Sequence, residues 1–531
     1  MRERIIEILR KNVEIPGGVS FSVEHPPRAE LGDYATNLPL VLAGLEKKQP
    51  QDVAEMLMRK IIDPAIATIT FSPPGFLNFQ ISESEVKKEF TRILDGKERY
   101  GNQSRLNEKI QVEFISANPT GPLTLANGRG GFLGDVLSRV LASQGFEVER
   151  EYYINDSGNQ ITTLGLSILA IAGKVLDDEK YYHGDYLKEW LDSKQTLNWD
   201  LYLKDPQLLG IYVANDFVKN LIRPVIEKKM KINFDRWTSE QRDIRQSRPP
   251  LTIEFEQLAK SISPDLIFDR DGARWLKTKK YGDDKDRVLV TSDRLPTYFF
   301  IDAAHYLETK KRGFNHKINI LGADHHGYVS RIQAVAKIIG MAKSEVIVMQ
   351  LVRLMENGVE RRMSKRTGVY VTIDELIDEV GLDQARYFFL EKNHETHIDF
   401  DLDLAKKRSK ENPVFYIQYA HARLCSIFIK EPYEKSDFDV SLLASESEDR
   451  LIWKLIDFPD VLRDIAADYR VSRLIRYAYE LAHNFHVFYE TERILDAAAD
   501  IKKSRLQLAR ATQIVLKKSL DLLGISAPEE M

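Results

Sequence analysis

Short apolar runs alternate with amphipathic stretches through the middle of the chain. The apolar runs have the length of buried strands, and the stretches between them repeat their apolar positions at helical spacing. Strands are predicted at residues 109–116, 147–155, 317–323 and 345–352, with helices between them that include 128–143 and 327–340. Alternating strands and helices predict a parallel, doubly wound sheet of the Rossmann type.

The regions around this sheet have different patterns. Residues 1–105 combine an amphipathic helix, polar turns and short strands, which predicts a small α+β domain. Residues 396–531 are helical almost throughout and predict an α-helical bundle. Within the central domain, residues 106–395, a charged and mainly helical stretch near 165–285 indicates an insertion between the halves of the sheet. We therefore expect a multidomain protein of the α/β plus all-α class.

The composition is ordinary for a soluble protein, with 43% hydrophobic and 29% charged residues among 531. No apolar run approaches the roughly 20 residues that span a bilayer, and the charged N-terminal helix lacks the apolar centre of a signal peptide. Cys425 is the only cysteine, so neither a disulfide framework nor a cysteine-based zinc site is expected. These features predict a cytoplasmic protein with no membrane partner. The net charge of −4 neither indicates nor excludes nucleic acid.

A Pro- and Gly-rich loop follows the first predicted strand of the sheet and is the first candidate site. Its sequence from residue 118 is NPTGPLTLANGR, and it leads directly into a helix. A helix N-terminus presents unpaired amides and a positive dipole end, so such a loop can bind an anion. Ligands of open α/β sheets also bind beyond the carboxyl ends of the strands, where this loop lies. The alternative is a turn whose Gly and Pro only shape the backbone.

The second candidate is a Gly-flanked loop that carries Met363-Ser364-Lys365-Arg366 and precedes an amphipathic helix. A compact ammonium on such a loop can close over a polyphosphate as negative charge develops. The alternative is an ordinary solvated turn, because lysine-rich loops are common.

Together the two loops resemble the ATP-binding motifs of class I aminoacyl-tRNA synthetases. The flanking sequence narrows the resemblance to arginyl-tRNA synthetases of the bacterial type, and it extends over the whole chain. Matching segments are GDYATNLPLVLA, PPGFLNFQ, EFISANPTGPL, REYYINDSGNQI, PTYFFIDAAHYL, GADHHGYVSRI, RRMSKRTG, THIDFDLDLA and NPVFYIQYAHARLCSI. The resemblance implies that ATP with Mg²⁺ activates L-arginine, which is then transferred to the 3′ end of tRNA-Arg. It also implies that the arginine carboxylate is the nucleophile, and we expect a monomer.

An acidic pocket is the natural site for a guanidinium, which offers five donors in a fixed plane. Tyr298 and Asp302 are spaced to share one face of a helix, and Glu113 lies on the strand that enters the first loop, five residues before Asn118. Taken alone, these residues fit an exposed helix pair and an edge-strand charge better than they fit a pocket. The resemblance implies that Glu113, Tyr298 and Asp302 hold the guanidinium and that Asn118 holds the α-amino group.

The resemblance also assigns residues to ATP. The catalytic set is Thr124, Asn127 and Lys365, and the ATP-binding set is Pro119, Gly121, Ala126, Gly128, Gly322, Asp324, His325, Met363, Ser364 and Lys365. Catalysis by these residues would consist of positioning and of stabilising phosphate charge. The adjacent His325 and His326 point apart, and no third ligand is spaced to complete a site, so neither zinc nor another protein-bound metal is predicted.

One departure from the family pattern affects the first loop. Thr124-Leu125-Ala126-Asn127 stands where the family has His-x-Gly-His, so both histidines are absent. Thr and Asn can still donate hydrogen bonds, but the Ala126 methyl group is expected to crowd the adenine. In the second loop Arg362 replaces a usual lysine, while Lys365 is kept. The departure predicts weaker activity and leaves open a catalytically weakened or inactive paralogue that binds tRNA.

The resemblance implies that the helical bundle binds the anticodon arm and that the N-terminal domain contacts the D-loop corner of the tRNA. Candidate tRNA contacts are Tyr34, Asn37, Asn78, Gln418, His421, Arg423, Arg473 and Arg476. Splayed bases stack on aromatic side chains and are read by hydrogen bonds. The alternative is that half of the aromatic residues in these helices belong to the core of the bundle, which we expect for Tyr416 and Tyr419.

Overall fold

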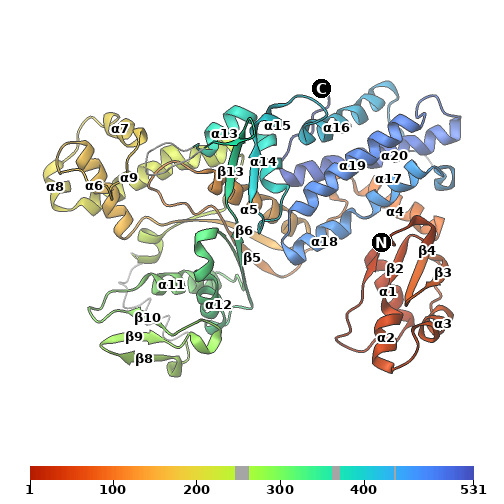
Figure 1. Cartoon of the computed structure of the whole chain (residues 1–531), viewed down its shortest axis with the longest axis horizontal. Helices are drawn as coiled ribbons and strands as arrows, with labels where there is room; N and C mark the ends of the chain where they lie inside the picture. The colour runs from red at the N-terminus through yellow and green to blue at the C-terminus, as the bar shows by residue number, and fades with distance from the viewer. Residues whose placement is uncertain (246–261, 362–370, 436–437) are drawn as a thin grey trace.

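The computed structural model describes residues 1–245, 262–361, 371–435 and 438–531. The N-terminal region lies beside the C-terminal helices, and the helical insertion lies at the opposite end of the molecule (Figure 1). The predicted loop with Met363, Ser364 and Lys365 falls outside the described residues.

Five parallel strands form the central sheet, in the order β12-β11-β5-β6-β7. They are β5 (Lys109–Glu113), β6 (Glu147–Ile154), β7 (Arg236–Ser239), β11 (His316–Gly322) and β12 (Lys343–Met349). The predicted parallel, doubly wound sheet is therefore confirmed, with four strands where the apolar runs placed them. The edge strand β7 was not predicted, because Arg-Trp-Thr-Ser is short and has no apolar run.

The two faces of this sheet differ in polarity, because side chains alternate along each strand. On one face, Val112 and Ile318 join the apolar core that includes Phe132 of α5 (Leu125–Ser143). The other face carries Gln111, Glu113, Glu149, Glu151, Lys317 and Asn319. It is covered by α11 (Tyr298–Lys311), which packs against α12 (Val329–Ile338) through a separate apolar cluster.

A helical lobe connects β6 to β7. It consists of α6 (Asn159–Ile171), α7 (Asp185–Asp192), α8 (Trp199–Lys204), α9 (Pro206–Phe217), η3 (Val218–Ile222) and η4 (Val225–Lys229). Gly165 and Gly210 let α6 and α9 approach closely, since a Cβ at either would meet the backbone of the other segment within 2 Å.

A small antiparallel sheet precedes α11. Its strands are β8 (Ile267–Arg270), β9 (Ala273–Leu276) and β10 (Arg287–Val290), in the order β10-β9-β8. The stretch near 165–285, which the sequence pattern indicates as mainly helical, thus also contains β7, β8 and β9. These strands are four residues each, too short for a clear alternation.

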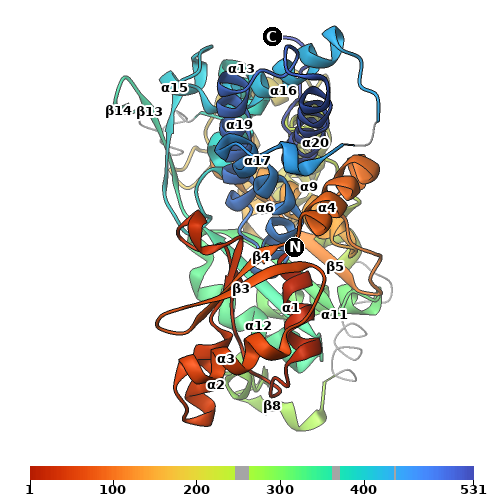
Figure 2. The ribbon, with the colours of Figure 1, turned by 90° about the vertical axis from the view of Figure 1, so that its right-hand side faces the viewer.

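The N-terminal region is an antiparallel sheet with flanking helices. Its elements are α1 (Arg2–Asn12), β1 (Val23–Glu24), β2 (Tyr34–Thr36), α2 (Leu38–Glu46), α3 (Pro50–Lys60), β3 (Ile66–Ser72), β4 (Phe76–Ile81) and α4 (Glu83–Gly96). The region docks on the bundle through ion pairs, and Figure 2 shows it directly below the C-terminal helices. Arg2 lies 2.6 Å from Asp464, and His25 Nε2 lies 2.8 Å from Asp457.

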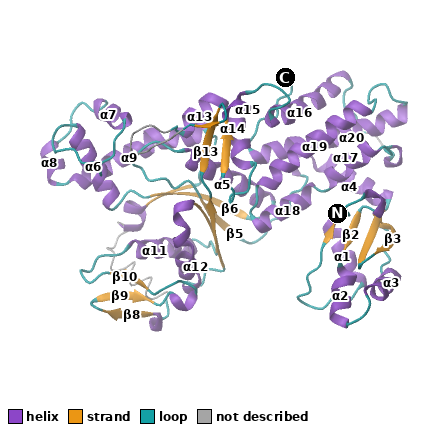
Figure 3. Cartoon of the chain, in the orientation of Figure 1, coloured by secondary structure: helices purple, strands orange, loops and turns teal. Residues whose placement is uncertain are grey.

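A three-stranded sheet and two helices lead into the C-terminal bundle (Figure 3). They are β13 (Val352–Glu356), β14 (Val359–Glu360), α13 (Ile373–Val380), α14 (Leu382–Leu390) and β15 (Ile398–Asp401), followed by the short α15 (Leu402–Lys406). β15 pairs with β13 in parallel, so the predicted all-helical region beginning at 396 starts with a strand. The bundle consists of α16 (Pro413–Lys430), α17 (Glu446–Ile456), α18 (Phe458–Asp468), α19 (Ser472–Thr491) and α20 (Ala499–Leu523).

Arg386 of α14 joins three elements that are distant in sequence. Its buried guanidinium donates to Asp135 Oδ2 of α5 at 2.8 Å, to the Leu523 carbonyl at the end of α20 at 3.1 Å, and to the Met230 carbonyl at 2.9 Å. The sheet domain and the bundle therefore share a buried polar junction. Among the helices of the described part of the chain, none combines the length and apolarity needed to cross a membrane.

Candidate active site

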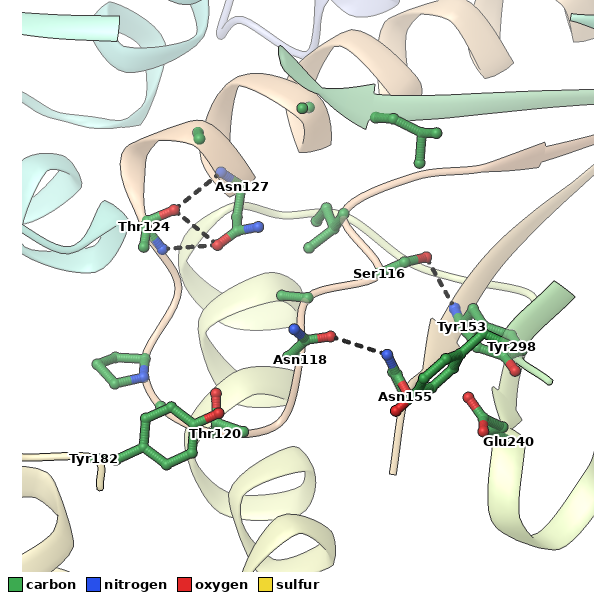
Figure 4. A pocket seen from close by; sticks show the side chains of 18 of the residues that line it. Ser116, Asn118, Thr120, Thr124, Asn127, Tyr153, Asn155, Tyr182, Glu240 and Tyr298 are labelled. Carbon is green, nitrogen blue, oxygen red and sulfur yellow. Dashed lines mark hydrogen bonds between the residues drawn. The ribbon is translucent and has the colours of Figure 1, made fainter. Parts of the chain in front are cut away.

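A cavity of about 1680 Å³ opens at the carboxyl ends of the central strands. Its wall includes the predicted residues Glu113, Asn118, Gly121, Thr124, Ala126, Asn127, Tyr298, Asp302 and Gly322. The structure thus brings together residues that the sequence assigned to two different ligands. Figure 4 shows the loop with Thr124 and Asn127 on one side of the cavity and Tyr298 on the other.

Thr124 and Asn127 form a reciprocal cap at the start of α5. The Asn127 backbone N–H donates to Thr124 Oγ1. In return, the Asn127 side-chain Oδ1 accepts from the Thr124 backbone N–H at 3.0 Å and from the Thr124 hydroxyl at 2.9 Å. This is a capping box, and it fixes the first turn of the helix. In Figure 4 the Asn127 side-chain nitrogen points away from Thr124. Nδ2 is therefore a side-chain donor left over for an anion.

Other ATP-assigned residues lie in different places. Gly128 faces α13, where a Cβ would come within 2.4 Å of Ile373, so its small size serves helix packing. Neither Gly128 nor Pro119 is among the residues that line the cavity. Asp324 and His325 belong to η8 (Ala323–Tyr328), and their side chains lie outside what the structure describes.

Asp302 is the carboxylate that most clearly lacks a partner. Its side chain is half-buried at the cavity wall, and its inaccessible Oδ2 has no hydrogen-bond donor among the residues that the structure describes. Burial, together with the charges of Glu240 and Glu113, raises the pKa of Asp302 well above its usual range. A buried carboxylate without a donor is costly, so this position favours a cationic ligand. Tyr298, one turn earlier, is 60% exposed at the cavity edge.

Both carboxylate oxygens of Glu113 already have partners within the protein. Its Oε2 accepts from Asn319 Nδ2 at 2.7 Å and lies 2.9 Å from Lys317 Nζ, while Oε1 accepts from the Ser116 hydroxyl at 3.3 Å. Glu113, Glu151 and His305 have ligand atoms close enough for a metal ion. Lys317 Nζ, however, also lies 3.3 Å from Glu151, so an ammonium already neutralises this cluster. The cluster is better described as a salt-bridge network than as a metal site.

Several residues of the cavity wall were missed by sequence reasoning. Glu240 begins η5 (Glu240–Arg245), accepts from Arg245 Nε at 2.7 Å and contributes to the raised pKa of Asp302. Asn155 donates to Asn118 Oδ1 at 3.3 Å. Tyr186 of the helical lobe donates to the Thr120 carbonyl at 2.9 Å, so the lobe forms one wall beside the loop. The one available signal was the position of Asn155 at the end of a predicted strand, residues 147–155.

Four of the predicted tRNA contacts lie in the interior. They are Tyr34, Asn78, Gln418 and His421, each at most 8% exposed. Tyr34 donates to Asp457 at 3.1 Å across the domain junction, and Gln418 donates to Asp383 at 2.8 Å. Each of the four side chains has at least one internal hydrogen-bond partner, and the structure does not bring them to the surface. Asn37 is half-buried and accepts from the Ser22 amide at 2.8 Å.

The three arginines lie nearer to solvent. Arg473 and Arg476 are exposed on α19, and Arg473 is paired with Asp468. Arg423 is half-buried, with its guanidinium 4.6 Å from the centre of the Tyr419 ring and 4.5 Å from that of Tyr489. Of the predicted tRNA contacts, only Arg473 and Arg476 are exposed.

Comparison with known proteins agrees with this architecture. Residues 1–81 match the arginyl tRNA synthetase N terminal domain family, and residues 417–531 match the DALR anticodon binding domain family. The arginine--tRNA ligase of Carboxydothermus hydrogenoformans is 40% identical, over 97% of this chain and 94% of the relative. That of Citrifermentans bemidjiense is also 40% identical, over 98% and 96%. Thermus thermophilus arginyl-tRNA synthetase superposes with a TM-score of 0.81 at 22% identity, covering 100% of this chain and 99% of that structure.

Proposed function

The chain belongs to the arginyl-tRNA synthetase family, and on that premise we propose that it is an arginine--tRNA ligase, an ATP-dependent class I enzyme that activates L-arginine and transfers it to tRNA-Arg. One observation carries the proposal: Asp302, whose inaccessible Oδ2 has no donor among the described residues, lines the same cavity as the capped helix start at Thr124 and Asn127. A cation site and an anion site in one cavity suit a cationic amino acid and a nucleotide. The comparisons contain nothing that favours an inactive paralogue.

The amino acid occupies the acidic side of the cavity in this proposal. The guanidinium pairs with Asp302, and Glu113 offers its Oε1, since Oε2 is held by Lys317 and Asn319. Tyr298 lies at the edge of this pocket, and the Asn118 side chain supports the α-amino group. Charge-assisted hydrogen bonds to a planar guanidinium supply both affinity and orientation.

The nucleotide occupies the loop side. ATP enters as its Mg²⁺ complex, which we treat as the substrate. The free amides in the first turn of α5 and Asn127 Nδ2 are the donors nearest to the phosphates. Lys365 adds a point charge as negative charge develops on the phosphates. No protein-bound zinc is part of the proposal.

The chemistry requires no protein nucleophile. The arginine carboxylate oxygen attacks the α-phosphorus of ATP, the bond to the β-phosphate oxygen breaks, and pyrophosphate leaves with its electron pair. A hydroxyl of the terminal tRNA ribose then attacks the arginyl carbonyl carbon and displaces AMP, with loss of the hydroxyl proton to solvent. Positioning and electrostatic stabilisation account for catalysis of this kind.

We further propose the division of labour that the sequence predicts. Residues 106–395 perform the chemistry, while residues 1–105 and 396–531 bind the tRNA. The protein acts as a monomer. On the bundle, Arg473 and Arg476 are the exposed cations that suit phosphate contacts.

An aminoacylation assay tests the function directly. The full chain is incubated with radiolabelled arginine, ATP, Mg²⁺ and total tRNA, and acid-precipitable arginyl-tRNA is counted. We expect charging with arginine and none with lysine or citrulline. Binding of tRNA without charging would contradict the proposal and leave the paralogue that only binds tRNA.

A further inference from the structure

The polar layer between α11 and the central sheet contains a lysine that the proposed reaction does not use directly. Lys317 is fully buried on β11 and does not line the cavity. Its Nζ lies 2.9 Å from Glu113 Oε2 and 3.3 Å from Glu151 Oε2. The Tyr306 ring lies 4.9 Å from the same nitrogen. A lysine so buried retains its charge only when acids surround it.

The strand register explains why a cation is needed there. Glu113 of β5 and Glu151 of β6 are register partners on adjacent strands, and their side chains lie on the same face. Like charges side by side on a sheet repel each other, and burial increases the repulsion. Lys317, on the other neighbour of β5, bridges the two carboxylates. Burial alone would lower the pKa of Lys317, but Glu113 and Glu151 raise it above its ordinary value.

Glu151 belongs to the inner end of this network and does not line the cavity. His305 Nε2 lies 3.0 Å from Glu151 Oε2, and the Thr238 hydroxyl donates to Oε1 at 2.5 Å. Burial would raise the pKa of Glu151, yet His305 and Lys317 hold it well below its usual range. The charged and titratable groups around Lys317 are Glu113, Glu151, His305, Tyr306 and Asp302, with Arg236 and Arg312 near the far oxygen of Glu151.

We propose that Lys317 is a positioning residue for arginine selection, an internal ammonium that holds Glu113 in place and reserves Asp302 for the side chain of the substrate. With Lys317 present, Glu113 Oε2 is occupied, and Oε1, which accepts from Ser116, is the oxygen that remains for the substrate. Among the described residues that line the cavity, Asp302 has the one buried carboxylate oxygen without a donor. The pocket then matches a single planar monocation, so this inference rests on the proposed function and adds a residue that sets its specificity.

The test uses steady-state aminoacylation by the full chain with Lys317→Met. We expect the arginine KM to rise by about tenfold, while the ATP KM stays within about twofold. The pH profile should change as well. Lys317 counteracts the raised pKa of Asp302, so without the ammonium that pKa rises further, and kcat/KM for arginine should fall more steeply with decreasing pH than in the wild type. A purely structural defect would not change how kcat/KM for arginine decreases at low pH.

Two further variants make the result interpretable. Lys317→Met/Glu151→Gln removes one negative charge as well, and should recover part of the arginine KM and of the pH profile. Lys109→Met is the matched control, because Lys109 starts β5 and pairs with Glu147 at the surface, outside the pocket. If Lys317→Met does not fold, Lys317→Gln keeps a donor without the charge and is measured in the same way.

The outcomes separate this inference from the proposed function. Wild type that does not charge tRNA with arginine contradicts the proposed function. Wild type that charges tRNA, with an unchanged arginine KM and pH profile in the Lys317 variant, overturns the role of Lys317 alone. Equal rises in the arginine and ATP KM values, without a change of pH profile, also overturn it, because they indicate general damage.

Discussion

The two faces of the central sheet are built from the same strands but contribute different properties. On the α5 side, Val112 and Ile318 pack with Phe132 in a continuous apolar core. On the α11 side, the neighbouring positions Glu113 and Lys317 form a buried charged layer. Apolar burial is non-directional and tolerates small shifts, whereas buried charges require fixed geometry. Stability is therefore concentrated on one face, and in the proposed function substrate selection depends on the other.

The largest effect is expected from an apolar deletion. Phe132→Ala removes a fully buried ring from the α5 face, and should lower the free energy of unfolding by on the order of 3–5 kcal/mol. Chemical denaturation followed by circular dichroism measures this loss. At a temperature where the variant is folded, its arginine KM should match the wild type. A changed KM with unchanged stability would break the proposed separation of the two faces.

Asp302→Ala tests the charged face. It should raise the arginine KM by about two to three orders of magnitude, which corresponds to roughly 3–4 kcal/mol for a desolvated charge partner, and leave the ATP KM nearly unchanged. Steady-state kinetics with each substrate varied in turn gives both constants. An unaltered arginine KM would remove Asp302 from the pocket. Asp293→Ala, on an exposed turn before α11, serves as the control.

The capped helix start should respond more mildly. Asn127→Asp keeps the cap acceptor and replaces Nδ2, the donor that points away from the cap, with a negative charge. We expect kcat to fall by on the order of a hundredfold, with a smaller change in the ATP KM. Thr124→Ser retains the hydroxyl and should stay close to wild type, whereas Thr124→Val should lose about 1 kcal/mol of stability. Equal kcat for the Asp and wild-type enzymes would show that Nδ2 does not contact the phosphates.

The smallest effect concerns stability and pH. Because the folded-state pKa of Asp302 is raised, the unfolded chain ionises first as the pH increases above about 4, and folding then becomes less favourable up to the folded pKa. Asp302→Asn removes this penalty. Without arginine, its melting temperature should therefore exceed that of the wild type at pH 8 by more than at pH 4. A difference that does not depend on pH would contradict the raised pKa.

The sequence predicted the sheet better than it predicted the environment of the site. Apolar runs located β5, β6, β11 and β12, because a parallel sheet buries its strands on both sides. The resemblance to a known family selected Glu113 and Asp302, and the structure places both in one cavity. Lys317 could not be identified in the same way. A lysine inside KINILG reads as a strand-end charge until the register with β5 shows which carboxylates it meets.

Tertiary contacts also determine which of the predicted tRNA-contacting side chains are buried and which are exposed. Tyr34 and Gln418 have the chemistry of base-contacting side chains, and no local pattern distinguishes a surface role from an interior one. Their partners Asp457 and Asp383 are far away in sequence, so the burial depends on how the domains dock. Arg473 and Arg476 are exposed because they lie on the outer face of α19, as helical periodicity allows.

The junction at Arg386 has a mechanical consequence. Helix α5 begins at the capped loop and continues for 19 residues, about 28 Å, as a stiff rod. The Arg386 guanidinium donates to Asp135, near the middle of α5, and also to a carbonyl in the last turn of α20. A displacement of the bundle should therefore tilt α5 as a rigid unit and move the start of this helix at Thr124. Arg386→Lys replaces the two donor nitrogens of the guanidinium with one, which cannot reach all three partners. We expect this variant to speed hydrogen exchange at residues 124–128, and unchanged exchange there would show that the bundle and the start of α5 are not coupled.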